Sequence, residues 1–211
     1  FAFWKTAGLY ARCDNLTAKT KGEFVTVRAN YTLPNGQTLP IDFAIDSAGR
    51  CDITMTWQGA RTELPEFGLL FPLRRELTEV SYLGLGPRET TADRTAGGKM
   101  GAWSYNVRQD FAQNSPVYPQ ECGSRTGVYR ADLTGAIPGI CFAGDSMTFS
   151  ALPYTPHELE NARHLYELPR DDNKTVVRCA AFQRGVGGDN SWGAKPHADA
   201  CFAVEKGTSF R

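Results

Sequence analysis

Alternation of apolar and polar residues marks the first sixty positions and predicts consecutive antiparallel strands. The run from Phe24 to Tyr31 alternates, and Pro34-Asn35-Gly36 then supplies the residues of a tight turn. Alternation resumes from Ile41 to Asp46, and after a second turn it returns from Cys51 to Trp57. This pattern predicts three strands, each paired with the next along the chain.

Short runs of the same kind recur along the rest of the chain, with Gly, Pro, Asn or Asp between them. They span Glu79 to Leu83, Trp103 to Val107, Gly127 to Leu133, Gly139 to Ala143, Met147 to Leu152, Thr175 to Phe182 and Cys201 to Glu205. Regularly spaced short strands with turn residues between them are typical of antiparallel sandwiches. The sequence therefore predicts an all-β protein, with residues 1–211 forming a single β-sandwich region.

One helix start stands out from this background. Thr155 can cap a helix, Pro156 suits its first position, and Glu158 completes a capping box. We expect one short helix that ends at Pro169. Its buried face should carry Leu159, Ala162 and either Leu165 or Tyr166.

Composition narrows the classes of function. Lys plus Arg and Asp plus Glu both number 23, so no excess charge attracts nucleic acid or an anionic membrane. No apolar stretch approaches the roughly 20 residues of a membrane helix, and the start lacks the layout of a signal peptide. The six cysteines form no C-x-x-C pair, which favours reduced thiols over a disulfide framework or a zinc ribbon. We expect a soluble, cytoplasmic protein.

The ends of the sequence suggest a piece of something longer. The chain opens on Phe1 rather than Met and stops at Arg211, inside what reads as a strand. A sandwich cut in this way would expose a sheet edge, which is a hazard for aggregation. We therefore expect low stability for the isolated chain.

No catalytic group is apparent among the ionisable residues. Glycoside hydrolysis needs two facing carboxyl groups, and the acidic residues show no such pair. Those in suggestive surroundings are better explained as turn-formers or partners of arginine; they are Asp93, Glu121, Asp145 and Asp189. The three histidines, His157, His164 and His197, lack the spacing of a metal site. We predict no catalytic residue and no metal ligand in this chain.

The segment from Gly185 to Gly193 is different in kind, because four glycines surround one large aromatic residue, Trp192. It carries no Lys-Ser or Lys-Thr pair, so it is a poor phosphate loop. A tryptophan on such a loop can stack on the C–H face of a sugar. The structural alternative is that Trp192 plugs the end of the sandwich.

Four separated segments resemble one family. Tyr82-Leu83-Gly84-Leu85-Gly86-Pro87-Arg88-Glu89 with Asp93-Arg94 is similar to its Y-x-G-x-G-P-x-E…D-R signature, and residues 119–126 to its P-Q-E-x-G-N-R-T. Residues 149–168 resemble its F-S-A…T…H-x-x-E-L stretch, and residues 185–193 its G-V-G-G-D-D-S-W-G. The chain thus resembles the last domain of the large bacterial β-galactosidases of glycoside hydrolase family two. Two departures are visible, Ser124 for Asn and Asn190 for the second Asp.

The resemblance implies an antiparallel supersandwich, similar to that of galactose mutarotases, that packs near a catalytic barrel elsewhere in a homo-oligomeric enzyme. In that family the two catalytic glutamates of retaining hydrolysis and the magnesium ligands lie upstream, so this chain would contain no cofactor site. Trp192 would stack on the aglycone side of a β-galactoside such as lactose. Its support would come from Gly187, Gly188, Asp189, Asn190 and Ser191.

Two other classes stay open. A free-standing carbohydrate-binding module usually shows two or three coplanar exposed aromatics, and only Trp192 has such a context here. A mutarotase-like epimerase needs an acid and a base that converge in a cleft. His164 and Glu167 are the nearest candidates for that pair.

Overall fold

The chain forms two compact, predominantly β units in a computed structural model that describes residues 2–170, 173–190 and 192–211. Unit 1 comprises Phe1–Pro65 and Cys201–Arg211, and unit 2 comprises Glu66–Ala200. All strand pairs of the described sheets are antiparallel, which confirms the predicted all-β class. The single sandwich region expected over residues 1–211 stays a prediction.

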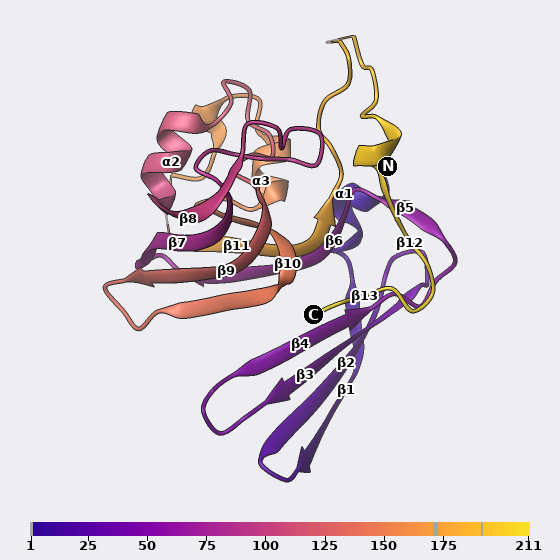
Figure 1. The fold of residues 1–211 in the computed structure, drawn as a ribbon. Coiled ribbons are helices and arrows are strands. Elements are labelled where there is room, and N and C mark those ends of the chain that lie inside the picture. Colours follow the sequence, from indigo (N-terminus) through magenta and orange to yellow (C-terminus); the bar gives the residue numbers. More distant parts are fainter. Residues whose placement is uncertain (1, 171–172, 191) are drawn as a thin grey trace. The chain divides into compact units, whose positions relative to one another are not determined.

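Unit 1 contains a five-stranded sheet with the order β1-β2-β3-β4-β13 (Figure 1). Its strands are β1 (Arg12–Lys21), β2 (Phe24–Thr32), β3 (Thr38–Ile45), β4 (Cys51–Thr56) and β13 (Ser209–Phe210). A short ribbon pairs β5 (Thr62–Leu64) with β12 (Phe202–Val204), and helix α1 spans Trp4–Ala7. The three consecutive strands predicted from the alternation are β2, β3 and β4, so that prediction is confirmed.

The turns between these strands follow from their residues. Gly36 adopts φ +82°, and its N–H donates to the Leu33 carbonyl at 2.8 Å. In the next turn Asp46 Oδ1 accepts from the backbone N–H groups of Ala48 and Arg50 at 3.0 and 2.9 Å. Because each turn is closed by its own polar groups, the register of the strands is set locally.

Trp57 is the largest fully buried side chain of unit 1. Its indole N–H donates to the Ala60 carbonyl at 3.0 Å, and its backbone N–H donates to Thr208 at 2.8 Å. Trp4 of α1 packs against it with ring centroids 6.1 Å apart. This residue therefore ties the amino-terminal helix and the last strand to β4.

Unit 2 is organised around a six-stranded sheet with the order β6-β11-β10-β9-β7-β8. The strands are β6 (Glu66–Arg74), β7 (Leu77–Gly86), β8 (Lys99–Asn106), β9 (Arg125–Gly135), β10 (Ile140–Leu152) and β11 (Lys174–Gln183). Two of the predicted short strands, Gly139 to Ala143 and Met147 to Leu152, are one strand, β10. The register against β9 shifts between Ala143 and Met147, so an irregularity rather than a turn separates them.

The helices differ in part from the prediction. The capping box of Thr155 and Glu158 is present, with Pro156 in the first turn, but α3 ends at Asn161 (Pro156–Asn161) and not at Pro169. A 3-10 turn, η1 (Leu165–Glu167), follows instead, and its Leu165 and Tyr166 are exposed, so their predicted burial is wrong. Helix α2 (Val107–Asn114), which is capped by Asn106, was not predicted. None of the helices in the described residues is long and apolar enough to cross a membrane.

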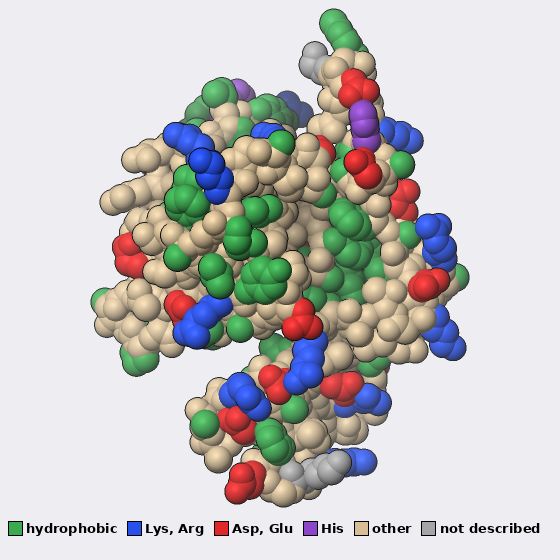
Figure 2. Space-filling model, viewed as in Figure 1, with side chains coloured by type: hydrophobic (Ala, Val, Ile, Leu, Met, Phe, Trp, Pro, Cys, Tyr) green, Lys and Arg blue, Asp and Glu red, His purple; other side chains and the backbone are tan. Residues whose placement is uncertain are grey.

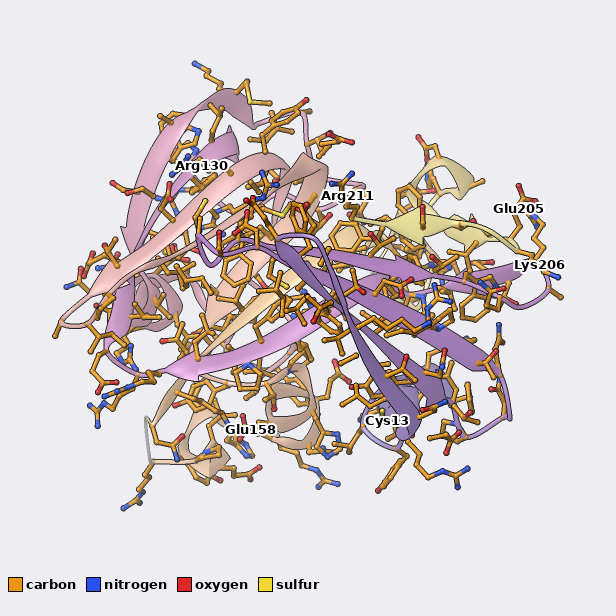
Figure 3. The ribbon with its side chains drawn as sticks, turned by 90° about the horizontal axis from the view of Figure 1, so that it is seen from below. Cys13, Arg130, Glu158, Glu205, Lys206 and Arg211 are labelled. Atoms are coloured by element: carbon orange, nitrogen blue, oxygen red, sulfur yellow. The ribbon has the colours of Figure 1, made fainter. Side chains whose placement is uncertain are left out.

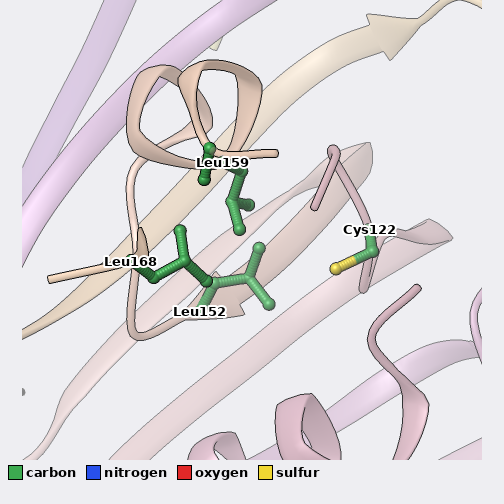
Figure 4. Packing of buried hydrophobic residues seen from close by; sticks show 5 residues of the cluster. Cys122, Leu152, Leu159 and Leu168 are labelled. Carbon is green, nitrogen blue, oxygen red and sulfur yellow. The ribbon is translucent and has the colours of Figure 1, made fainter. Parts of the chain in front are cut away.

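The helices α2 and α3 lie over the same face of the six-stranded sheet (Figure 1). Figure 4 shows the apolar cluster beneath α3, in which Leu159 meets Leu152 of β10, Leu168 and Cys122. Phe111 of α2 and Tyr154 both pack against this cluster. Their two rings meet edge to face, with centroids 5.1 Å apart. Burial of Leu159 is what fixes α3, since a six-residue helix is too short to be stable by itself.

We predict that Leu159→Ala lowers the free energy of unfolding by about 2–5 kcal/mol, because it leaves a cavity in a cluster where Leu159 is 1% exposed. Leu165→Ala is the matched control, since this leucine is 45% exposed and should cost less than about 0.5 kcal/mol. Urea denaturation followed by circular dichroism measures both. Equal losses for the two variants would contradict the assigned packing of α3.

Candidate functional site

The tryptophan segment, residues 185–200, forms a closed loop between β11 and the 3-10 turn η2 (Ala198–Ala200). The Gly185 N–H donates to the Ala200 carbonyl at 2.9 Å, so the two ends of the loop meet at a neck. Figure 1 shows the loop extending away from the sheet beyond the end of β11, and Figure 2 shows a hydrophobic side chain at its outer end. A compact loop of this kind presents its tip to whatever lies beyond the surface.

Trp192 lies in this loop and is 92% exposed. Its backbone N–H donates to the Asn190 side-chain oxygen at 2.8 Å. The alternative that Trp192 plugs the end of the sandwich is therefore wrong for this chain. The departure at Asn190 is also explained, because a carboxamide oxygen accepts this bond as a carboxylate would.

The loop has two limbs, residues 185–190 and residues 193–197, and other predicted support residues lie where the limbs meet each other or the rest of unit 2. Gly188 lies so close to the second limb that a Cβ at this position would collide with the Ala194 carbonyl. Asp189 accepts from His197 Nε2 at 2.7 Å, and this hydrogen bond raises the pKa of His197 above its ordinary value. Gly187 donates its N–H outward, to Asp93 at 2.7 Å. Ser191 lies outside the described residues.

A buried polar group lies at the carboxyl end of β11, just before the loop begins. Arg178 is its centre, with a side chain only 3% exposed, and it pairs with Glu66 at 3.1 Å and with Glu121. Ser124 and Gln183 complete the group, which we call the Arg178 cluster. A buried guanidinium needs such partners, because an unpaired charge away from water is costly.

Ser124, the second departure from the family pattern, takes part in this cluster. Its hydroxyl donates to Gln183 Oε1 at 2.7 Å and accepts from Arg178 Nη2 at 2.8 Å. Gln183 in turn donates to Glu121. Because Gln183 is the last residue of β11, the cluster fixes the point from which the loop departs.

The remaining sequence candidates do not form a catalytic pair. Glu121 neutralises Arg178, Asp189 contacts His197, and Asp145 is exposed on β10. The pair considered for an epimerase, His164 and Glu167, lies 3.2 Å apart on the surface, with side chains 59% and 38% exposed. Among the residues that the structure describes, no three His, Cys, Asp or Glu side chains gather closely enough to hold a metal ion.

A shallow depression lies over β7, β8 and β9 in unit 2, and Leu83, Trp103 and Arg130 contribute to it. Arg130, seen on β9 in Figure 3, forms a two-pronged pair with Asp132 at 2.7 and 2.8 Å. The charged groups of this depression therefore already satisfy each other. The exposed loop is the stronger candidate site.

The fold and the site define an all-β chain that presents an exposed tryptophan on a tethered surface loop. Comparison with known proteins gives the family: the sequence matches the β-galactosidase small-chain family over residues 1–211, and the chain belongs to it.

Individual relatives agree with this assignment. The chain is 37% identical to a β-galactosidase of Lactobacillus delbrueckii subsp. bulgaricus, over all of this chain and 21% of that protein. It is 32% identical to a β-galactosidase of Streptococcus thermophilus, over 93% of this chain and 20% of that protein. It is 34% identical to a β-galactosidase small subunit of Latilactobacillus sakei, over 90% and 70%. The chain thus spans about a fifth of the length of the first two and most of the small subunit.

We predict that Arg178→Met lowers the free energy of unfolding by about 3 kcal/mol, because it leaves two carboxylates without their buried counter-ion. This loss of stability lies at the low end of the usual range, because the side chains of Glu66 and Glu121 are still 25% and 28% exposed to water. Arg130→Met is the matched control, and its exposed pair should contribute less than about 1 kcal/mol. Urea denaturation compares the two, and an Arg178→Met protein as stable as the control would contradict the role of the cluster.

Proposed function

We propose that this chain is the non-catalytic sandwich region of a β-galactosidase of glycoside hydrolase family two, and that Trp192 contacts the aglycone side of the substrate. The observation that carries the proposal is the exposure of a large aromatic side chain, 92%, on a loop whose neck and limbs are held by hydrogen bonds. Exposing an indole to water has no benefit for stability in this chain. An exposed aromatic side chain on a tethered loop is expected of a residue that contacts a ligand or a partner.

A sugar suits this residue better than a protein partner does. The C–H face of a pyranose is apolar and flat, so it can lie against an indole, while the indole N–H remains free for a hydroxyl or for water. Because the backbone of the loop is tethered, little conformational entropy is lost when the sugar binds. The family to which the chain belongs supports a β-galactoside as that sugar.

The hydrolytic step belongs, in this proposal, to the rest of the enzyme. Two glutamates of a catalytic barrel would carry out retaining hydrolysis there. The magnesium ligands of the parent family would lie there too, because the described carboxylates, histidines and thiols of this chain form no fitting group. The parent would be a homo-oligomer acting on galactosides such as lactose.

A reducing compartment, the cytoplasm, is part of the same proposal. The six cysteines form no disulfide in the described structure, and burial raises the pKa of Cys122 and of Cys179 to about 12. Thiols with such pKa values are protonated at neutral pH and therefore poor nucleophiles for disulfide exchange. Six cysteines without a disulfide are typical of a protein kept in a reducing compartment.

We predict that Trp192→Ala raises KM for a chromogenic β-galactoside by about 3- to 10-fold in the assembled enzyme, as expected for loss of one stacking contact. The assembled enzyme is the full-length chain, or this chain with its large subunit. Trp192→Phe should retain most of the affinity, because it keeps a flat apolar face. Steady-state kinetics measures all variants.

Tyr166→Ala is the matched control, since Tyr166 is also a strongly exposed aromatic, at 74%, but belongs to η1. It should leave KM unchanged. The 211-residue chain alone should not hydrolyse the substrate. Turnover by the isolated chain, or an unchanged KM for Trp192→Ala, would contradict the proposal.

A further inference from the structure

Asp93 contacts the tryptophan loop from a segment far away in sequence. Its Oδ2 accepts the Gly187 N–H at 2.7 Å, across 94 positions of the chain. The other oxygen, Oδ1, accepts from the Thr91 hydroxyl at 2.6 Å. One carboxylate thus joins residues 87–98, the segment that follows β7, to the first limb of the loop.

The segment that carries Asp93 is itself well anchored. Thr90 and Thr91 are 2% and 3% exposed, and the Thr90 N–H donates to the Ser124 carbonyl at 2.9 Å. The Thr90 hydroxyl also accepts from the backbone N–H of Thr126 at 2.9 Å. Asp93 therefore extends toward the loop from a base that is fixed to the start of β9.

Packing at the neck of the loop brings Asp93 close as well. A Cβ at Gly185 would lie 2.8 Å from Asp93 Cγ and 2.9 Å from the Ala200 Cβ. Only glycine at position 185 lets the carboxyl group of Asp93 approach the neck this closely. The contact between Asp93 and the loop thus comprises a hydrogen bond and a close backbone approach.

The charge of Asp93 suits this task. Burial raises its pKa, but the hydrogen bonds from Thr91 and from the N–H groups of Gly187 and Val186 outweigh burial, and the net pKa is lowered. Asp93 is then ionised at neutral pH. Both oxygens are acceptors in that form, as the two contacts require.

We infer that Asp93 is a positioning residue for Trp192: its carboxylate holds the first limb of the loop so that the indole stays in one place for the substrate. The inference rests on the proposed sugar contact of Trp192. Asp93 acts at Gly187, five positions before the tryptophan, and does not itself touch the sugar. Loss of the carboxylate frees the limb between the neck and the tip.

Asp93→Asn is the variant that tests this with the least change in size. An asparagine at position 93 keeps one accepting oxygen for the Gly187 N–H, but its amide nitrogen only donates, so the Thr91 hydroxyl must accept where it now donates. The Gly187 contact also loses the negative charge that strengthens it. In the assembled enzyme we expect KM for the chromogenic β-galactoside to rise about 2- to 5-fold, with kcat within about 2-fold. Asp145→Asn, the same change at an exposed aspartate of β10, is the control and should leave both constants unchanged.

A double-mutant cycle separates positioning from a general structural effect. If Asp93 acts through Trp192, then Asp93→Asn combined with Trp192→Ala raises KM no further than Trp192→Ala does alone. Additive effects would overturn the inference. A second readout, amide hydrogen exchange, should show faster exchange at Gly187 in Asp93→Asn, and unchanged exchange there would also overturn it.

The two proposals fail in distinguishable ways. If Trp192→Ala leaves KM unchanged, the sugar contact is wrong and the role of Asp93 in positioning for the substrate falls with it, even where exchange at Gly187 still reports the anchor. If Trp192→Ala raises KM but Asp93→Asn does not, the sugar contact stands and only the role of Asp93 is overturned.

Discussion

The buried guanidinium of Arg178 is the constraint on which the geometry of unit 2 depends. A charged group that is 3% exposed must be paired, and in this chain its partners come from three places: β6 with Glu66, the strand preceding the loop with Gln183, and the connection before β9 with Glu121 and Ser124. Satisfying one charge therefore brings three segments together at one end of the sheet. The tryptophan loop departs from this point.

Rigidity at the base and exposure at the tip explain how a glycine-rich loop can present an aromatic residue. The four glycines allow the chain to reverse and its limbs to approach, but they contribute no side-chain packing of their own. Order is supplied instead by contacts at three levels, the neck at Gly185 and Ala200, the anchor at Asp93, and the bond between Asp189 and His197. A preorganised contact of this kind binds with a smaller entropic cost.

The sequence predicted the parts of this arrangement that are local. The strands β2, β3 and β4 follow from alternation and turn residues, and the start of α3 follows from its capping box, because these signals act over a few residues. The end of α3 and the exposure of Leu165 and Tyr166 depend on packing against the sheet, which periodicity does not report. Arg178, Gln183 and the contact of Asp93 with Gly187 join positions 54 to 94 residues apart, so no local pattern indicates them. Glu121 pairs with Arg178, which is one of the two roles expected for it, whereas the contact of Asp93 with Gly187 was not predicted.

The proposed contact of Trp192 with the aglycone side of a β-galactoside can be observed directly at that residue. 5-Fluorotryptophan placed at position 192 of the assembled enzyme gives one resolved fluorine resonance, which is followed by NMR during titration with a non-hydrolysable aryl β-thiogalactoside. We expect a saturable shift of this resonance, with a dissociation constant equal to the inhibition constant of the thiogalactoside. A label placed at Trp103 instead should show no shift. A resonance from position 192 that stays unchanged at saturating inhibitor would contradict it.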